Sequence, residues 1–111
     1  KVEMSRVKTG QITYAVRNTN IDGVEIHEND IMALGDRGIL SVTQSVEETT
    51  LSALKAMVDD ESELITLYYG ADVPEEEAQK ILEKAQEMFD FCDVELHYGG
   101  QPIYYYMISV E

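Results

Sequence analysis

Two apolar runs separated by a helical segment constrain the fold of this chain more than any other feature. The runs LITLYYG (64–70) and VELHY (94–98) have the length and the β-forming residues of strands, and the first is typical of a strand buried on both faces. Between them, Asp72, Pro74 and three glutamates begin a helix with negative charge at its positive end. Its apolar stripe consists of Ala78, Ile81, Leu82, Ala85 and Phe89. This order predicts a right-handed βαβ unit with parallel strands.

The four residues Gly99-Gly100-Gln101-Pro102 follow the second run and are too few for a crossover. We therefore expect a tight hairpin, with a final strand over 103–110 that runs antiparallel to 94–98. Alternation along this strand places Ile103, Tyr105 and Met107 on one face and Tyr104, Tyr106, Ile108 and Val110 on the other. Neither face is polar, which is typical of a central strand or of a strand covered on both sides.

The first half of the chain reads as short antiparallel strands. QITYAVR (11–17) alternates between its two faces, and VEI (24–26) follows a turn at Asp22-Gly23. The runs IMAL (31–34) and ILSV (39–42) flank a glycine-containing loop, so they are predicted to pair as a hairpin.

A first helix is indicated by Ser45 and Glu48, which form a capping box. Its apolar stripe consists of Leu51, Leu54, Met57 and Val58. The predicted fold class is therefore α/β (α+β): a mixed β-sheet with two helices on one face. Because two helices cover only one face of such a sheet, tyrosines on the other face are candidates for a contact surface.

Charge limits the classes of partner. The net charge is −14, which argues against nucleic acid or an anionic membrane, and no apolar run is long enough to span a membrane. Residues 46–111 carry three bases and sixteen acids. The basic residues Lys1, Arg6, Lys8 and Arg17 gather around the first strand, as a charged strand edge or as a site for a negatively charged group.

Length and cysteine content limit the organisation of the chain. A chain of 111 residues fits one domain (1–111), and because it starts at Lys1 we expect a piece of a longer protein. The single cysteine, Cys92, excludes an internal disulfide and favours the cytoplasm.

No complete catalytic motif is present in the sequence. Gly99-Gly100 lacks the lysine and the following helix of a phosphate-binding loop. His27, His97 and Cys92 lack the spacing of a metal site or a nucleophile–base pair. The acidic cluster Asp59, Asp60, Glu61 and Glu63 could hold Mg²⁺, but its place between a helix and a buried strand favours a solvated loop.

Three stretches in order along the chain carry a family resemblance: VKTGQITYAVRNTNIDG (7–23), LITLYYGADVPEEEAQ (64–79) and VELHYGGQPIYYYMISVE (94–111). They resemble the C-terminal domain of the catalytic subunit of bacterial fatty acid kinase, one of the dihydroxyacetone-kinase-like proteins. The stretches GQITYAVR and HYGGQPIY are the specific ones. The family pattern has a proline between the last tyrosines, where this chain has Tyr105.

The resemblance implies a division of labour along a longer protein. In that family an N-terminal helical domain binds ATP and magnesium, and the kinase phosphorylates the carboxylate of a fatty acid to give an acyl phosphate. The C-terminal domain engages a separate fatty-acid-binding protein of the DegV type. This chain would then be a non-catalytic docking domain without a cofactor of its own.

The expected partner-binding residues are Lys8, Gln11, Thr13, Arg17, Gln101, Tyr104 and Tyr106. In the alternative interpretation, the three consecutive tyrosines are simply core. A second function class stays open: a small ligand-binding or acid–base enzyme domain with Arg17, His97 and a terminal tyrosine around a pocket. A homodimerisation module would use the same tyrosine-bearing face.

Overall fold

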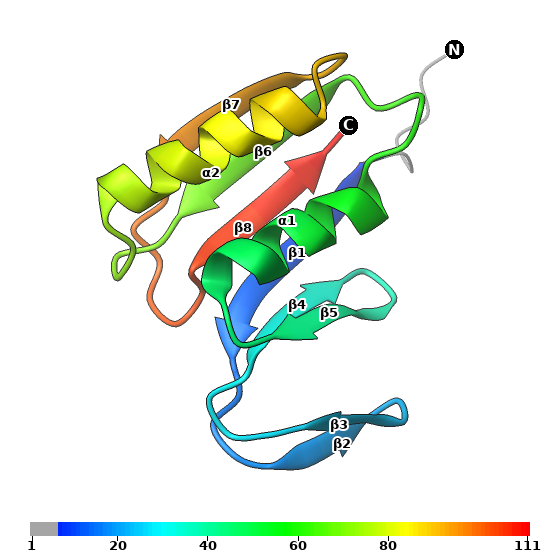
Figure 1. Cartoon of the computed structure of the whole chain (residues 1–111), viewed down its shortest axis with the longest axis vertical. Coiled ribbons are helices and arrows are strands. Elements are labelled where there is room, and N and C mark those ends of the chain that lie inside the picture. The colour runs from blue at the N-terminus through cyan, green and yellow to red at the C-terminus, as the bar shows by residue number, and fades with distance from the viewer. Residues whose placement is uncertain (1–6) are drawn as a thin grey trace.

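The structure is a computed structural model that describes residues 7–111. In these residues a mixed sheet has the strand order β5-β4-β1-β8-β6-β7, and a separate ribbon pairs β2 with β3 (Figure 1). The strands are β1 (Lys8–Tyr14), β2 (Thr19–Ile21), β3 (Val24–Ile26), β4 (Ile31–Gly35), β5 (Gly38–Thr43), β6 (Leu64–Tyr69), β7 (Asp93–Tyr98) and β8 (Tyr106–Val110). The helices are α1 (Val46–Met57) and α2 (Glu75–Met88). Neither helix has the length and apolarity to cross a membrane.

The βαβ unit and the β4–β5 hairpin are confirmed. β6 and β7 pair in parallel, with Leu64 opposite Asp93 and Tyr69 opposite Tyr98, and α2 connects them. β4 and β5 pair antiparallel. At the start of α1, the side chain of Ser45 accepts a hydrogen bond from the backbone N–H of Glu48, as the capping motif predicted.

The expected hairpin between β7 and β8 is wrong, although β8 does run antiparallel to β7. β8 lies between β1 and β6 and pairs antiparallel with both, so that Tyr106 is opposite Ile12 on one side and Tyr69 on the other. β8 is apolar on both faces and therefore takes a central place, whereas β7 carries Asp93 and Glu95 and remains at the edge.

Both helices cover the same face of the sheet, as predicted (Figure 1). The sheet residues beneath them are Ile12, Ile65, Leu67, Tyr106, Ile108 and Val110, and all six are buried. The helices contribute Ala53, Leu54 and Met57 from α1 and Ala78, Ile81 and Ala85 from α2. One hydrophobic core thus lies between a helix layer and a sheet layer.

The opposite face is covered at one end only. Ile26 of β3 is fully buried there, and it packs with Ala15 and Met32 in a second apolar cluster. β2 was not predicted, because three partly polar residues carry no clear strand pattern. Over β6 and β7 this face stays open, so Tyr68 is 40% exposed and the prediction that 64–70 is buried on both faces is wrong for Tyr68.

Tyr106 lies in the core. Its exposed fraction is 0%, so in this fold it presents no surface to a partner, and the interpretation of the tyrosines as core applies to this residue. Its hydroxyl has no hydrogen-bond partner among the described residues. Burial raises the pKa of this hydroxyl well above its usual value, so it stays protonated and neutral.

We predict that Tyr106→Phe leaves the free energy of unfolding unchanged or raises it by up to about 1 kcal/mol, because it removes a buried hydroxyl that makes no hydrogen bond. Ile108→Ala, in the same strand and on the same face, should cost about 2–5 kcal/mol through the cavity it leaves. Urea unfolding of both variants measures this. A loss above about 1 kcal/mol for Tyr106→Phe would mean that the hydroxyl does have a partner.

Candidate interaction surface

The structure separates the predicted partner-binding residues into two groups at opposite ends of β1. Lys8 lies beside Val110, where β8 ends, whereas Thr13 lies five residues further along β1, beside the 99–105 loop. Arg17 follows the end of β1 and is exposed. Lys1 and Arg6 lie outside the described residues. The tyrosines and Lys8 therefore do not form one continuous surface.

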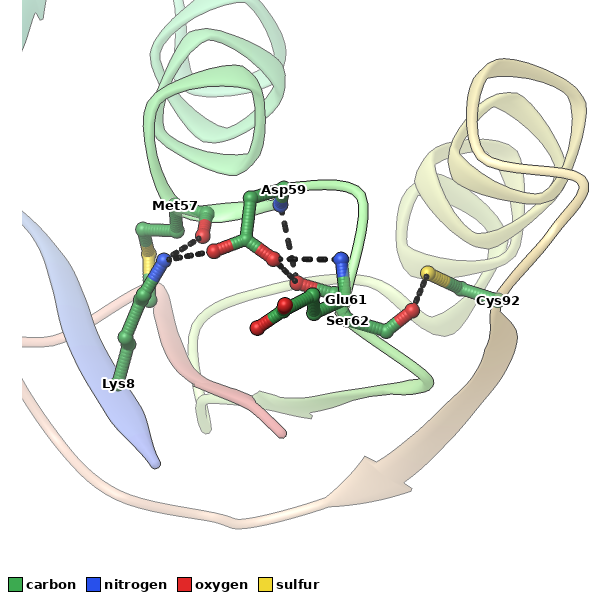
Figure 2. Close-up of polar contacts among 6 residues, drawn as sticks. All are labelled: Lys8, Met57, Asp59, Glu61, Ser62 and Cys92. Atoms are coloured by element: carbon green, nitrogen blue, oxygen red, sulfur yellow. Dashed lines mark hydrogen bonds and ion pairs between the residues drawn. The ribbon is translucent and has the colours of Figure 1, made fainter. Parts of the chain in front are cut away.

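Lys8 takes part in an internal polar network (Figure 2). Its Nζ donates to the backbone carbonyl of Met57 at 2.8 Å and to Oδ2 of Asp59 at 3.0 Å. That carbonyl belongs to the last turn of α1, where carbonyl groups lack a donor within the helix. The ammonium thus caps the end of the helix and fixes the start of β1 against it, which gives this cation a structural role.

Asp59 closes the loop between α1 and β6. Its Oδ1 accepts from the backbone N–H of Glu61 at 2.9 Å and from Oγ of Ser62 at 3.2 Å. The carbonyl of Ser62 in turn accepts from Sγ of Cys92 at 3.3 Å, which joins the loop to the start of β7 (Figure 2). The hydrogen bond from Lys8, and then that from the Glu61 backbone, lower the pKa of Asp59 to about 2.

The acidic cluster at 59–63 is this hydrogen-bonded loop. In the described part of the chain, no group of three or more His, Cys, Asp or Glu side chains is placed to hold a metal ion. A shallow hollow of about 570 Å³ lies beside the network, between the start of β1, the β4–β5 turn and the end of α1. Lys8 and Arg37 are the cations that line it, together with the carboxylate of Asp36.

The residues of the alternative enzyme site do not come together. His97 lies on β7, three strands from β1 and therefore about 14 Å from it, and Arg17 lies beyond the end of β1. His97 contacts Glu95 at 3.1 Å and stacks on the ring of Tyr68 at 5.7 Å. None of the three hollows found on the described surface is lined by Arg17, His97 or Tyr104.

Exposed apolar side chains gather instead at the end of the sheet where the parallel strands β6 and β7 finish. Tyr98 is 65% exposed, Ile103 56% and Tyr68 40%. The rings of Tyr98 and Tyr69 contact at 5.2 Å between centroids. Such carboxyl ends of parallel strands are the usual place for a functional surface in α/β sheets. We call Tyr68, Tyr98, Ile103 and the half-buried Tyr104 the aromatic end.

The 99–105 loop is held rigidly at the aromatic end by backbone hydrogen bonds. The N–H groups of Gly99 and Gly100 donate to the carbonyl of Tyr69 at 2.8 and 3.2 Å. On the other side, the Tyr105 N–H donates to the carbonyl of Ile12 at 2.7 Å. The loop is thereby fixed to both neighbours of β8, which lets it present side chains without a large loss of entropy on binding.

Gln101 and Thr13, two predicted partner-binding residues, support this loop. Nε2 of Gln101 donates to the carbonyls of Tyr68 at 3.1 Å and Tyr104 at 3.2 Å. Oγ1 of Thr13 donates to the carbonyl of Ile103 at 3.1 Å, and Thr13 is only 6% exposed. Gln11 is half-buried on the same face as Thr13. These residues position the aromatic end rather than form most of its exposed area.

Ile103 adopts an unusual backbone conformation. Its φ is +75°, a region that β-branched residues rarely enter, and its side chain is more than half exposed. Core packing therefore does not explain the choice of isoleucine here, and such a strained residue indicates a functional constraint. The positive φ also explains why β8 begins at Tyr106 and not at 103 as predicted.

The chain was compared with known proteins once this geometry was established. The model of the FakA-like C-terminal family, which describes the C-terminal part of fatty acid kinase proteins, matches residues 1–111. This chain belongs to that family.

Its relatives are longer proteins. The uncharacterized protein SH1689 of Staphylococcus haemolyticus is 38% identical over 108 residues, which cover 97% of this chain and 20% of that protein. Protein YloV of Bacillus subtilis is 33% identical over 108 residues, with the same shares. The uncharacterized protein SAR1202 of Staphylococcus aureus is 39% identical over 108 residues, again with these shares. This FakA-like C-terminal domain therefore spans about a fifth of the curated relatives it matches.

Sequence reasoning missed Tyr68, Tyr98 and Ile103 of the aromatic end. A signal was present for Tyr98, which directly precedes the Gly-Gly pair. Tyr68 and Ile103 could not be found in this way, because their exposure depends on which strand lies beside β6 and on where the open face begins.

The lowered pKa of Asp59 generates a prediction about pH. Because folding lowers this pKa from its ordinary 3.8 to about 2, the ionised carboxylate stabilises the fold above about pH 4, and this contribution is lost as the pH falls through about 2. Asp59→Asn should lower the melting temperature slightly at pH 7, and the difference from the unmodified chain should shrink between about pH 4 and pH 2. Asp60→Asn, one residue away, is the control. A difference that persists at pH 2 would contradict the role of Asp59.

The contact between Gly70 and the 99–105 loop generates a second prediction. A Cβ added to Gly70 would lie 2.3 Å from the backbone oxygen of Tyr104 and 2.8 Å from that of Gln101. Gly70→Ala should therefore reduce the free energy of unfolding by about 1–3 kcal/mol, because backbone must move. A Cβ on Gly99 meets mainly the far end of the flexible Gln101 side chain, so Gly99→Ala should cost less. Equal stability of Gly70→Ala and the unmodified chain in urea would contradict this packing.

Proposed function

We propose that this domain is the docking module of a fatty-acid-kinase-like protein. In this proposal it binds a separate fatty-acid-binding protein of the DegV type, so that the kinase domain elsewhere in the same cytoplasmic chain can phosphorylate the carboxylate of the bound fatty acid. ATP and magnesium would be bound by that other domain. Membership of the FakA-like C-terminal family supports the kinase context.

The aromatic end is the observation that carries the docking proposal. Tyr68, Tyr98 and Ile103 are large side chains that are 40% to 65% exposed, and they lie on or beside a loop that is fixed by backbone hydrogen bonds. Tyrosine-rich, preorganised surfaces are typical of protein interfaces, because the rings supply contact area at low entropic cost. Gln101 and Thr13 would act as positioning residues for this surface, and Tyr104 would contact the partner at its margin.

The two basic residues that were predicted to contribute have different places in this proposal. Lys8 lies at the far end of β1 and is bound to Asp59, so it would contribute to stability. Arg17 is exposed beyond the end of β1 and remains a candidate contact for an acidic group of the partner.

A homodimer through the aromatic end is the second candidate that was left open at the sequence level. Each copy carries a net charge of −14, and the half of the chain that includes β6 and β7 is the more acidic half. Like charges on both sides oppose self-association at low ionic strength. A partner with a basic surface is therefore favoured over a second copy.

We predict that Ile103→Asn weakens binding of the DegV-type protein about tenfold or more but does not lower the melting temperature. Asparagine tolerates a positive φ better than isoleucine, so strain is relieved while the exposed apolar contact is lost. The measurement is calorimetric titration of the full-length protein that carries this domain, in parallel with thermal unfolding.

The matched control is Val24→Asn, because Val24 is also β-branched and 39% exposed but lies on the β2–β3 ribbon. It should leave the affinity unchanged. The docking role fails if Ile103→Asn binds as tightly as the unmodified protein, or if Val24→Asn weakens binding equally.

A further inference from the structure

β7 is the edge strand beside the aromatic end. In the described part of the chain it pairs with β6 alone, over all six residues from Asp93 to Tyr98. α2 packs over its inner face, where Val94 and Leu96 are half-buried against the core. The helix covers a face of the strand and leaves its free edge in solvent (Figure 1).

The pairing pattern shows which backbone groups of β7 point outward. The N–H of Asp93 donates to the carbonyl of Glu63 at 2.8 Å, and the N–H of Gly99 donates to that of Tyr69 at 2.8 Å. In a parallel pair, every second residue directs both its N–H and its C=O to the neighbouring strand. The backbone groups of Val94, Leu96 and Tyr98 therefore face away from the sheet, as three successive donor–acceptor pairs.

This edge lacks the features that normally block strand addition. Proteins protect free edges with lysine, proline or a β-bulge. β7 (DVELHY) contains no lysine, arginine or proline, and its register with β6 is continuous. At the other edge of the sheet, β5 pairs with β4 through a register shift and lies beside α1. β7 is thus the edge that is prepared to accept another strand.

Charge identifies the kind of strand that fits. Asp93 and Glu95 project from β7 on the open face, and only His97 of this strand is available there to offset them. The open face also bears Tyr68, which stacks on His97. A second copy of β7 would bring acidic side chains against acidic side chains, which is unfavourable for directly opposed residues. A strand with lysine or arginine facing Glu95 and an apolar residue near Tyr68 or Tyr98 would be complementary.

We infer that β7 is extended by an added strand: a basic, extended segment of the fatty-acid-binding partner pairs with the free edge at Val94, Leu96 and Tyr98. The inference rests on the docking function proposed above and specifies how the partner is held. Main-chain hydrogen bonds to three residues supply affinity, and the side chains around Tyr98 and Glu95 supply specificity. The segment then runs directly onto the aromatic end.

The test is amide hydrogen exchange of the full-length protein with and without the DegV-type protein. Without it, the outward amides of Val94, Leu96 and Tyr98 should exchange faster than the paired amides of Glu95 and His97. With it, the outward amides should slow at least tenfold. If the partner binds and these amides are unchanged, the strand-addition inference is overturned and the docking function stands. If the partner does not bind at all, the docking function is overturned and the inference with it.

A pair of variants separates the backbone from the side chain. Leu96→Pro removes an outward N–H, so no hydrogen bond to β6 is lost, and it should weaken partner binding at least tenfold. Leu96→Ala removes the same side-chain packing but keeps the N–H, and it should change affinity by less than about threefold. Equal affinities for the two variants would overturn the inference. Concentration-dependent protection of the three amides without partner would assign the edge to a second copy and would also overturn it.

Discussion

Strand β8 hydrogen-bonds to β1 on one side and to β6 on the other, and this double pairing joins the two halves of the molecule. β1, β4 and β5 form the antiparallel half, and β6, α2 and β7 form the βαβ half. The last strand in sequence completes a sheet whose other strands come before it, so the core under both helices closes only when β8 is in place. The apolar residues Tyr106, Ile108 and Val110 lie at the centre of that core.

The functional features follow from the path that the chain takes to reach this central position. After β7 the chain must pass the end of β6 before it enters the sheet, and residues 99–105 make this passage against Gly70. The passage leaves Tyr98 and Ile103 exposed and holds them rigidly. It also leaves β7 at the edge, because the place beside β6 is taken by β8. The aromatic end and the free edge therefore have one common cause.

The opposite end of the sheet has a different character. Lys8, Asp59 and Ser62 form hydrogen bonds that end α1 and fix the α1–β6 loop (Figure 2). The polar groups at this end are bonded to one another, while the apolar groups at the aromatic end face solvent. Because the hydrophobic effect acts mainly on exposed apolar area, the aromatic end has more to gain from a partner.

The sequence by itself determined the local elements of this protein: the capped α1, the β4–β5 hairpin and the βαβ unit follow from capping, turn residues and periodicity. It also determined that Tyr106, Ile108 and Val110 share a face. Only the tertiary structure decided that β8 inserts between β1 and β6, and therefore that Tyr106 is core while Tyr98 and Ile103 are surface. The physical reason is that periodicity assigns side chains to faces within a strand, whereas the choice of neighbouring strand depends on which pairing buries the most apolar surface across the whole chain.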